Sequence, residues 1–106
     1  MTAEKFNECI KNRFETCEKL LCRKADEYAT DDRLHNFKVA AEIQNCTPIT
    51  ALAGMMAKHT VSIYDLIQRY ENGFIVPAEL WNEKINDSIN YLLLLSAMLV
   101  EYAETE

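Results

Sequence analysis

The chain has 106 residues, of which 49% are hydrophobic and 26% charged, and its formal net charge is −6. This composition is typical of a globular protein, and we expect residues 1–106 to form a single domain. The acidic balance argues against a nucleic-acid-binding surface, because such a surface gathers Lys and Arg against phosphate. With only two Gly and two Pro, the chain has few sites for tight turns, which favours long helices over hairpins.

Neither a signal peptide nor a membrane span is evident in the sequence. The N-terminal residues alternate charged with apolar side chains, and the longest apolar stretch, residues 91–100, is interrupted by Ser96 and is too short for a bilayer. The four cysteines form no CxxC pair, which favours reduced thiols over a metal or disulfide framework; they are Cys9, Cys17, Cys22 and Cys46. We therefore expect a cytoplasmic protein with no membrane partner.

Helical periodicity begins close to the N-terminus. The first predicted helix covers about Ala3–Lys24, and its apolar residues recur at three- and four-residue steps, which predicts one buried stripe. This stripe comprises Phe6, Ile10, Phe14, Cys17 and Leu21. Residues 26–37 are rich in Asp, Thr and Asn, which favour caps and turns over helix interiors. A short helix, about Asn36–Gln44, is predicted to follow.

The third predicted helix has a clear signal at each end. Thr47 can cap free amides ahead of Pro48, and proline at the first helical position has no amide hydrogen to lose. The helix should then run over Pro48–Asn72, with Gly73 as its C-terminal cap. Its apolar stripe is Ile49, Leu52, Met56, His59, Ile63, Leu66 and Tyr70. Within this stripe His59 is predicted to be a structural histidine that finds a hydrogen-bond partner.

The last predicted helix, about Pro77–Ala103, is apolar on more than one face. Its main stripe comprises Trp81, Ile85, Ser88, Leu92, Leu95, Leu99 and Tyr102. Leu94 and Met98 lie on the opposite face and also need cover, for which a partner subunit is the leading candidate. Three long amphipathic helices and one short helix can bury their stripes only against one another, so we predict an all-α helical bundle that forms a homodimer or higher homo-oligomer.

Two groups of acidic residues are candidates for metal chemistry. Glu83 and Asp87 are four residues apart and project from one face of the last helix. The second group lies after the first helix: Asp26, Glu27, Asp31 and Asp32. Mg²⁺ prefers hard oxygen ligands and is usually held by a few carboxylates together with substrate phosphates. The alternative is that the helical pair lies on a solvated face and that the loop acids only cap helices.

Basic and aromatic residues near these acids are candidate contacts for a nucleotide. Lys58 and Arg33 could neutralise phosphate charge, and His35 lies in an otherwise polar loop. Three aromatic residues could stack on a base; they are Tyr28, Phe37 and Trp81. Each has a simpler interpretation, since lysines are often only surface residues and aromatics at such spacings are often core.

Three segments carry a family resemblance: KADEYATDDRLHNFKVAA, CTPITALAGMMAKHTVSIYDL and NEKINDSINYLLLL. Over about Leu20–Met98 the chain resembles small phage and prophage proteins, and more distantly the nucleotide-modification-associated and MazG-like all-α nucleotide pyrophosphohydrolases. In the distant relatives an acid-Tyr step closes one helix and an acidic pair ending in Asn-Tyr opens another. Glu27-Tyr28 and Asp87 followed by Asn90-Tyr91 match these steps, and Lys58 matches a lysine of the intervening helix. The MazG-like enzymes pair acids three residues apart, whereas Glu83 and Asp87 are four apart.

The leading hypothesis is therefore a MazG-like protein that acts on nucleoside triphosphates, possessing NTP pyrophosphohydrolase activity. Mg²⁺ would be held by Glu27, Glu83 and Asp87, which we take as the candidate catalytic and metal residues. The candidate substrate contacts are Lys58, Arg33, His35, Asn90 and Tyr28. The alternative is a non-catalytic helical phage accessory protein that acts as an oligomer and binds another protein through its acidic face. A helix-turn-helix regulator is disfavoured by the acidic charge.

Overall fold

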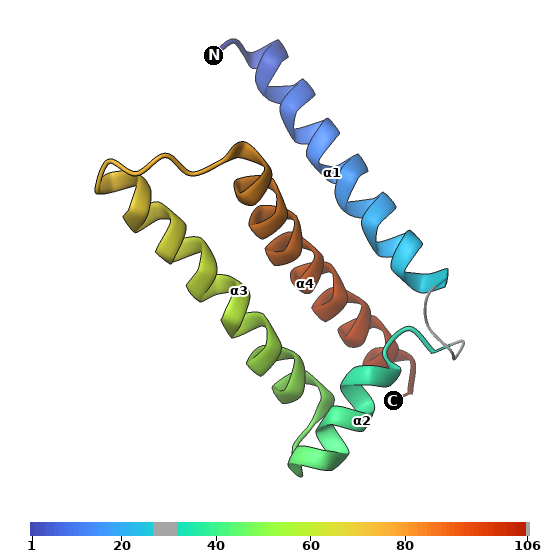
Figure 1. Ribbon diagram of the computed structural model, residues 1–106. Helices are drawn as coiled ribbons and strands as arrows, with labels where there is room; N and C mark the ends of the chain where they lie inside the picture. Colours follow the sequence, from blue (N-terminus) through green and yellow to red (C-terminus); the bar gives the residue numbers. More distant parts are fainter. Residues whose placement is uncertain (27–31, 106) are drawn as a thin grey trace.

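The structure is a computed structural model that describes residues 1–26 and 32–105, and every regular element in these ranges is an α-helix. The helices are α1 (Ala3–Asp26), α2 (His35–Gln44), α3 (Pro48–Glu71) and α4 (Ala78–Thr105) (Figure 1). The all-α prediction is confirmed, and each predicted helix end lies within two residues of the observed one. Within the described part of the chain, no helix combines the length and apolar character needed to cross a bilayer.

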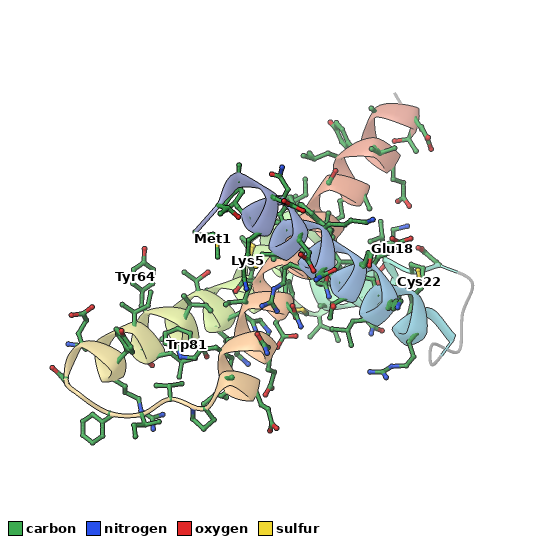
Figure 2. The ribbon with its side chains drawn as sticks, turned by 90° about the horizontal axis from the view of Figure 1, so that it is seen from above. Met1, Lys5, Glu18, Cys22, Tyr64 and Trp81 are labelled. Carbon is green, nitrogen blue, oxygen red and sulfur yellow. The ribbon has the colours of Figure 1, made fainter. Side chains whose placement is uncertain are left out.

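The four helices form an open arrangement around α4. In Figure 1, α4 lies between α1 and α3, and α2 closes one end of the bundle. Among the described residues, the backbone of α1 closely approaches only α4, whereas α3 packs against both α2 and α4. A view from above shows α1 and α4 crossing at an angle (Figure 2). The radius of gyration is 16.3 Å, compared with about 13 Å for a compact domain of this length.

Both ends of α3 have the capping chemistry that the sequence predicts. The Thr47 hydroxyl accepts a hydrogen bond from the Thr50 amide at 3.2 Å, and Pro48 occupies the first turn. At the other end Gly73 adopts a φ of 86°, which costs glycine little. This turn lets the Phe74 amide donate to the Arg69 carbonyl at 3.0 Å, as in a Schellman motif. The predicted start and stop of this helix are therefore confirmed.

The hydrophobic core lies where α2, α3 and α4 meet. Its buried members are Leu34, Phe37, Leu52 and Met98, and four partly buried residues pack against them: Met55, Tyr91, Leu94 and Leu95. The aromatic rings of Phe37 and Tyr91 meet edge to face, with their centroids 6.5 Å apart. Burial of these side chains is the main favourable contribution that holds this end of the molecule together.

The prediction for the buried face of α4 is correct only in part: Trp81, Ile85, Ser88 and Leu95 are partly buried, and Leu95 packs against the core. Of the predicted main stripe, Leu92, Leu99 and Tyr102 are exposed, whereas Met98 on the opposite face lies in the core. The cover predicted from a partner subunit for Leu94 and Met98 comes instead from α2 and α3 of the same chain. Because the second half of α4 is apolar on nearly every side, its periodicity alone could not specify which face is buried.

The predicted burial of the α1 stripe is correct only in part. Cys17 is fully buried, but Phe6, Ile10 and Phe14 have exposed fractions of 54%, 43% and 57%. One neighbouring helix cannot cover a stripe that extends along the whole of α1. The stripe prediction therefore fails for the N-terminal part of this helix.

Two hydrogen bonds from one arginine connect α1 to α4. Arg13 donates from Nη1 to Asn86 Oδ1 and from Nη2 to Asn82 Oδ1, both at 2.8 Å. The Cys17 sulfur lies 3.6 Å from Asn86 Oδ1. Burial raises the pKa of the Cys17 thiol, and the nearby Arg13 charge opposes this rise, so the thiol keeps its proton at neutral pH. Cys9, Cys22 and Cys46 are free thiols as well, which agrees with the predicted absence of disulfides.

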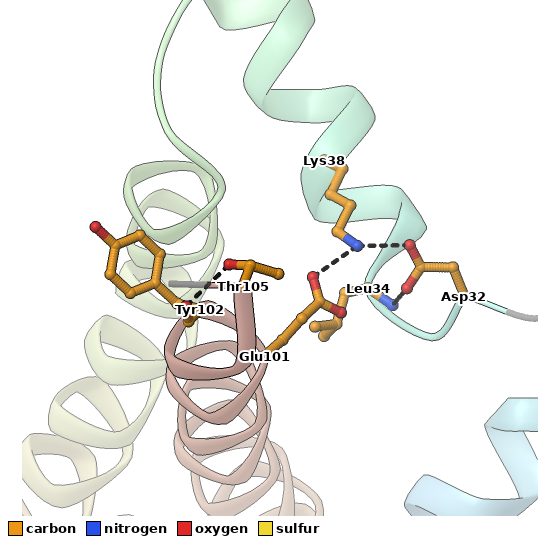
Figure 3. Close-up of polar contacts among 6 residues, drawn as sticks. All are labelled: Asp32, Leu34, Lys38, Glu101, Tyr102 and Thr105. Carbon is orange, nitrogen blue, oxygen red and sulfur yellow. Dashed lines mark hydrogen bonds and ion pairs between the residues drawn. The ribbon is translucent and has the colours of Figure 1, made fainter.

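An ion-pair network joins the start of α2 to the end of α4 (Figure 3). Lys38 Nζ lies 2.7 Å from Asp32 Oδ2 and 2.8 Å from Glu101 Oε1. Asp32 Oδ1 also accepts the Leu34 amide at 2.9 Å, so this loop acid serves as a turn and ion-pair residue. The hydrogen bond from Lys38 lowers the pKa of Asp32 from its ordinary value and raises that of Lys38.

Candidate functional site

Three of the predicted site residues meet at one small cavity between α1, α2 and α4. The cavity has a volume of about 80 Å³ and is lined by Leu21, Arg33, Phe37, Asp87, Asn90, Tyr91 and Leu94. Its lining combines an apolar wall with one guanidinium, one carboxylate and one amide. The sequence therefore identified its polar side chains and one residue of its apolar wall, Phe37, as candidate site residues, but not Leu21 or Leu94.

The polar contribution of α4 follows from helical spacing. Asp87, Asn90, Tyr91 and Leu94 are related by steps of three, four and seven residues, so they lie along one face of the helix. This face turns toward α2 because Leu94 packs against the core that contains Phe37. Core packing thus sets the direction in which Asp87 and Asn90 point.

Asn90 is the most unusual residue of the cavity. It has an exposed fraction of only 7%, and its Oδ1 has no hydrogen-bond partner among the described residues. A buried carbonyl oxygen without a partner costs about 1–3 kcal/mol, so such groups are normally satisfied by water, a cation or a ligand. The Asn90 oxygen is therefore a candidate ligand atom beside the Asp87 carboxylate.

Arg33 is held at the cavity by the end of α1. Its Nη2 donates to the Leu21 carbonyl oxygen at 3.2 Å, which fixes the plane of the guanidinium. A planar guanidinium presents five donors and pairs well with phosphate oxygens. The position of Arg33 therefore suits the role in charge neutralisation that the sequence predicted.

His59 borders this site, a position that the sequence analysis missed. Its Nδ1 lies 3.6 Å from Asp87 Oδ2, beyond hydrogen-bond distance, and its ring stacks at a tilt on Tyr91 with centroids 4.7 Å apart. The side chains of His59 and Asp87 are each 25% exposed. Tyr91 follows Asp87 by four residues, so helical spacing places Tyr91 beside Asp87 on α4. This spacing is the only signal in the sequence for the site to which the His59 ring, stacked on Tyr91, is brought. The structural role of His59 stays a prediction.

Three other predicted residues that the structure describes do not line the cavity. Glu83 lies one turn before Asp87 on α4 and is exposed, while Lys58 and His35 are exposed and do not line the cavity. Glu27 and Tyr28 lie outside the described residues. In residues 1–26 and 32–105, no three His, Cys, Asp or Glu side chains are close enough together to hold a metal ion.

Among the described residues, the cavity has side-chain oxygen donors on α4 only. Asp87 and Asn90 supply two kinds of oxygen donor, and Glu83 adds a second carboxylate nearby on α4. This donor set fits Mg²⁺ only if water or phosphate oxygens complete the coordination, as they usually do for this ion. No family model matches the chain, and no curated protein or solved structure matches it either.

Proposed function

We propose that the protein binds a nucleoside triphosphate together with Mg²⁺ at the Asp87–Asn90 cavity and hydrolyses it to the monophosphate and pyrophosphate. The observation that carries this proposal is the convergence of Arg33, Asp87 and the unpartnered Asn90 oxygen on one cavity. A volume of about 80 Å³ suits the metal and phosphate end of such a ligand, because whole small-molecule sites occupy about 300–1,000 Å³. The sugar and base would lie outside this cavity.

The charges at the cavity suit this reaction. Glu83 and Asp87 would hold Mg²⁺ with Asn90 beside them, and the ion would supply Lewis-acid polarisation of the phosphate oxygens. Arg33 would neutralise charge on the phosphate chain. In the hydrolysis a water oxygen forms a bond to the α-phosphorus, the bond between this phosphorus and the α,β-bridging oxygen breaks, and pyrophosphate leaves.

Thermal shift with matched variants tests the proposal. A ligand that binds only the folded state raises the melting temperature, so Mg²⁺ or Mn²⁺ should raise it and a nucleoside triphosphate should add to the effect. Asp87→Asn keeps the shape of the side chain and should cancel the metal response with little loss of stability. Asp65→Asn removes a carboxylate from an exposed position on α3 and serves as the control.

A panel of nucleoside triphosphates assayed for pyrophosphate release then separates an enzyme from a binding protein. We expect release with at least one nucleotide and its loss in Asp87→Asn, while His59→Ala should lower stability more than activity. No thermal shift with any metal or nucleotide, together with no pyrophosphate release, would contradict the proposal.

A second candidate function is a non-catalytic helical accessory protein that acts as a homodimer or higher homo-oligomer. It is favoured by the accessible surface of the protomer, which is 8018 Å², whereas a compact monomer of 12.2 kDa exposes about 6,100 Å². Large apolar side chains are exposed along α1, α3 and α4, including Tyr64, which projects from α3 (Figure 2). Most of these exposed apolar side chains lie outside the Asp87–Asn90 cavity.

A further inference from the structure

The N-terminal half of α1 carries apolar side chains that the described part of the chain leaves exposed. Arg13 meets the first turns of α4 through Asn82 and Asn86, and α1 runs in the same direction as α4 (Figure 1). The apolar residues Phe6 and Ile10 precede Arg13 on α1 and are both exposed. We call residues 3–14 the arm.

A groove with an apolar floor, which could receive the apolar side chains of the arm, lies at the opposite end of the molecule. It has a volume of about 660 Å³ and runs along the second half of α4 near the end of α1. Leu93, Ala97 and Val100 provide an apolar floor, and Glu101 and Glu104 stand along its rim. Leu93 and Val100 remain exposed in the protomer. Asp32 and Arg33 also line the groove, so charges of both signs surround an apolar floor that fits the apolar face of a helix.

The charges of the two helices are complementary. Six Lys and Arg residues outnumber five acidic residues in α1, whereas α4 carries one Lys and five acidic residues. The arm carries Lys5 and Lys11 beside Glu4 and Glu8, and Glu101 is already paired with Lys38, so Glu104 is the rim acid that a basic side chain of the arm would meet. An antiparallel arrangement would also bring the positive N-terminal end of α1 toward the negative C-terminal end of α4.

The exposed surface area of the protomer favours a second copy of this chain as the occupant of the groove. The protomer exposes about 1,900 Å² more than a compact monomer of its mass. Obligate dimers bury about 2,000–5,000 Å² in total, or half of that per subunit. The excess therefore equals what one subunit contributes to an obligate dimer.

We propose that two copies form an antiparallel two-fold dimer in which the arm of each copy packs into the α4 groove of the other. Phe6, Ile10 and Phe14 contact the Leu93, Ala97 and Val100 floor of the second copy. This inference names the surface used by the proposed self-association, and its groove shares Leu21, Arg33 and Leu94 with the Asp87–Asn90 cavity, so its tests are made on the protein without nucleotide. A two-fold axis makes the two arm–groove contacts identical, so the assembly closes at two subunits.

Light scattering and sedimentation of the full chain provide the first test. The wild-type protein should be a dimer at micromolar concentration, and Ile10→Asp in the arm or Val100→Asp in the groove should weaken dimerisation at least tenfold. Ile43→Asp on α2 places the same charge on another exposed isoleucine and should leave the dimer unchanged. Circular dichroism verifies that each variant is helical, and Phe6→Asp replaces Ile10→Asp if that variant does not fold.

Mixing the two variants gives the decisive result. Ile10→Asp keeps its groove and Val100→Asp keeps its arm, so an equimolar mixture should form a heterodimer through one intact arm–groove contact. A face-to-face contact of two arms could not show such complementation. A monomeric wild-type protein, a dimer that survives both substitutions, or a mixture that stays monomeric would each overturn the proposal, and none of these results depends on nucleotide binding.

Discussion

The two ends of this molecule are stabilised by different means. Where α2, α3 and α4 meet, apolar side chains pack into a core around Leu52, and an ion-pair network joins α2 to α4. Where α1 meets α4, the contact depends on Arg13 and a row of asparagines, and the apolar stripe of α1 stays exposed. Three helices thus share a core, whereas the fourth is connected to α4 through the Arg13 hydrogen bonds and the fully buried Cys17.

Because of this difference, the two regions should lose their structure under different conditions. Hydrophobic burial is non-directional and strong, whereas the net gain from a hydrogen bond is only about 0.5–1.5 kcal/mol. The α2–α4 unit should therefore stay folded under conditions in which α1 detaches. The cavity at Asp87 and Asn90 lies between the two regions, and Arg33 links it to α1 through the Leu21 carbonyl.

Leu52→Ala should produce the largest loss of stability. Leu52 is 1% exposed and lies at the centre of the core. Its truncation should lower the free energy of unfolding by about 2–5 kcal/mol through lost burial and the cavity left behind. Leu92→Ala makes the same change at an exposed position on α4 and should cost less than about 1 kcal/mol. Urea denaturation measures both, and equal losses would contradict this location of the core.

Arg13→Met should have an intermediate effect that is confined to α1. The substitution removes two hydrogen bonds and deprives the buried Asn86 amide oxygen of its closest donor. We expect a loss of about 1–3 kcal/mol, together with faster amide exchange in α1 and little change in α3.

Arg23→Met provides the matched control for this experiment, because Arg23 is an exposed arginine on the same helix. Exchange should be measured on a dimer-disrupted background such as Phe6→Asp, so that assembly does not protect α1. Uniform acceleration of exchange over all four helices would show that α1 is part of the core unit.

Local signals in the sequence predicted the helices well, since Thr47 and Gly73 specify the two ends of α3 through their own backbone chemistry. The sequence predicted the buried faces of these helices less well. In α4 the apolar residues surround the helix, so only the position of α2 decides that Met98 is buried and Leu99 is not. In α1 the stripe has correct helical spacing, but spacing cannot show that only one neighbouring helix is present to cover it.

The candidate site was predictable to the extent that it lies on one helix. Asp87 and Asn90 share a face of α4, and helical spacing alone places them together. Arg33 reaches the same cavity through the chain turn before α2, which periodicity does not describe. His59 was assigned to the core because it lies within an apolar stripe, yet α3 brings its ring beside Asp87.

Disruption of the ion-pair network around Lys38 should cause the smallest loss of stability, and this loss should be recognisable by its dependence on pH. The hydrogen bond from Lys38 lowers the pKa of Asp32 in the folded protein. Asp32 therefore contributes to the free energy of unfolding above its unfolded pKa of about 4, and this contribution is lost as the pH falls through its folded pKa. The hydrogen bond to Asp32 raises the pKa of Lys38 in the folded protein. Lys38 therefore contributes to the free energy of unfolding below its unfolded pKa of about 10.4, and this contribution is lost as the pH rises through its folded pKa. The network therefore stabilises the protein between these limits.

Lys38→Met should accordingly lower the melting temperature at pH 7 by less than Arg13→Met does, because the side chains of Lys38 and Asp32 are about 40% exposed and screened by water. The difference from wild type should shrink as pH falls below about 4, where Asp32 becomes protonated. Lys19→Met, at an exposed position on α1, should show no such pH dependence. A constant difference between Lys38→Met and wild type from pH 7 down to pH 3 would mean that Lys38 stabilises this end of the molecule through its methylene packing, not through its charge.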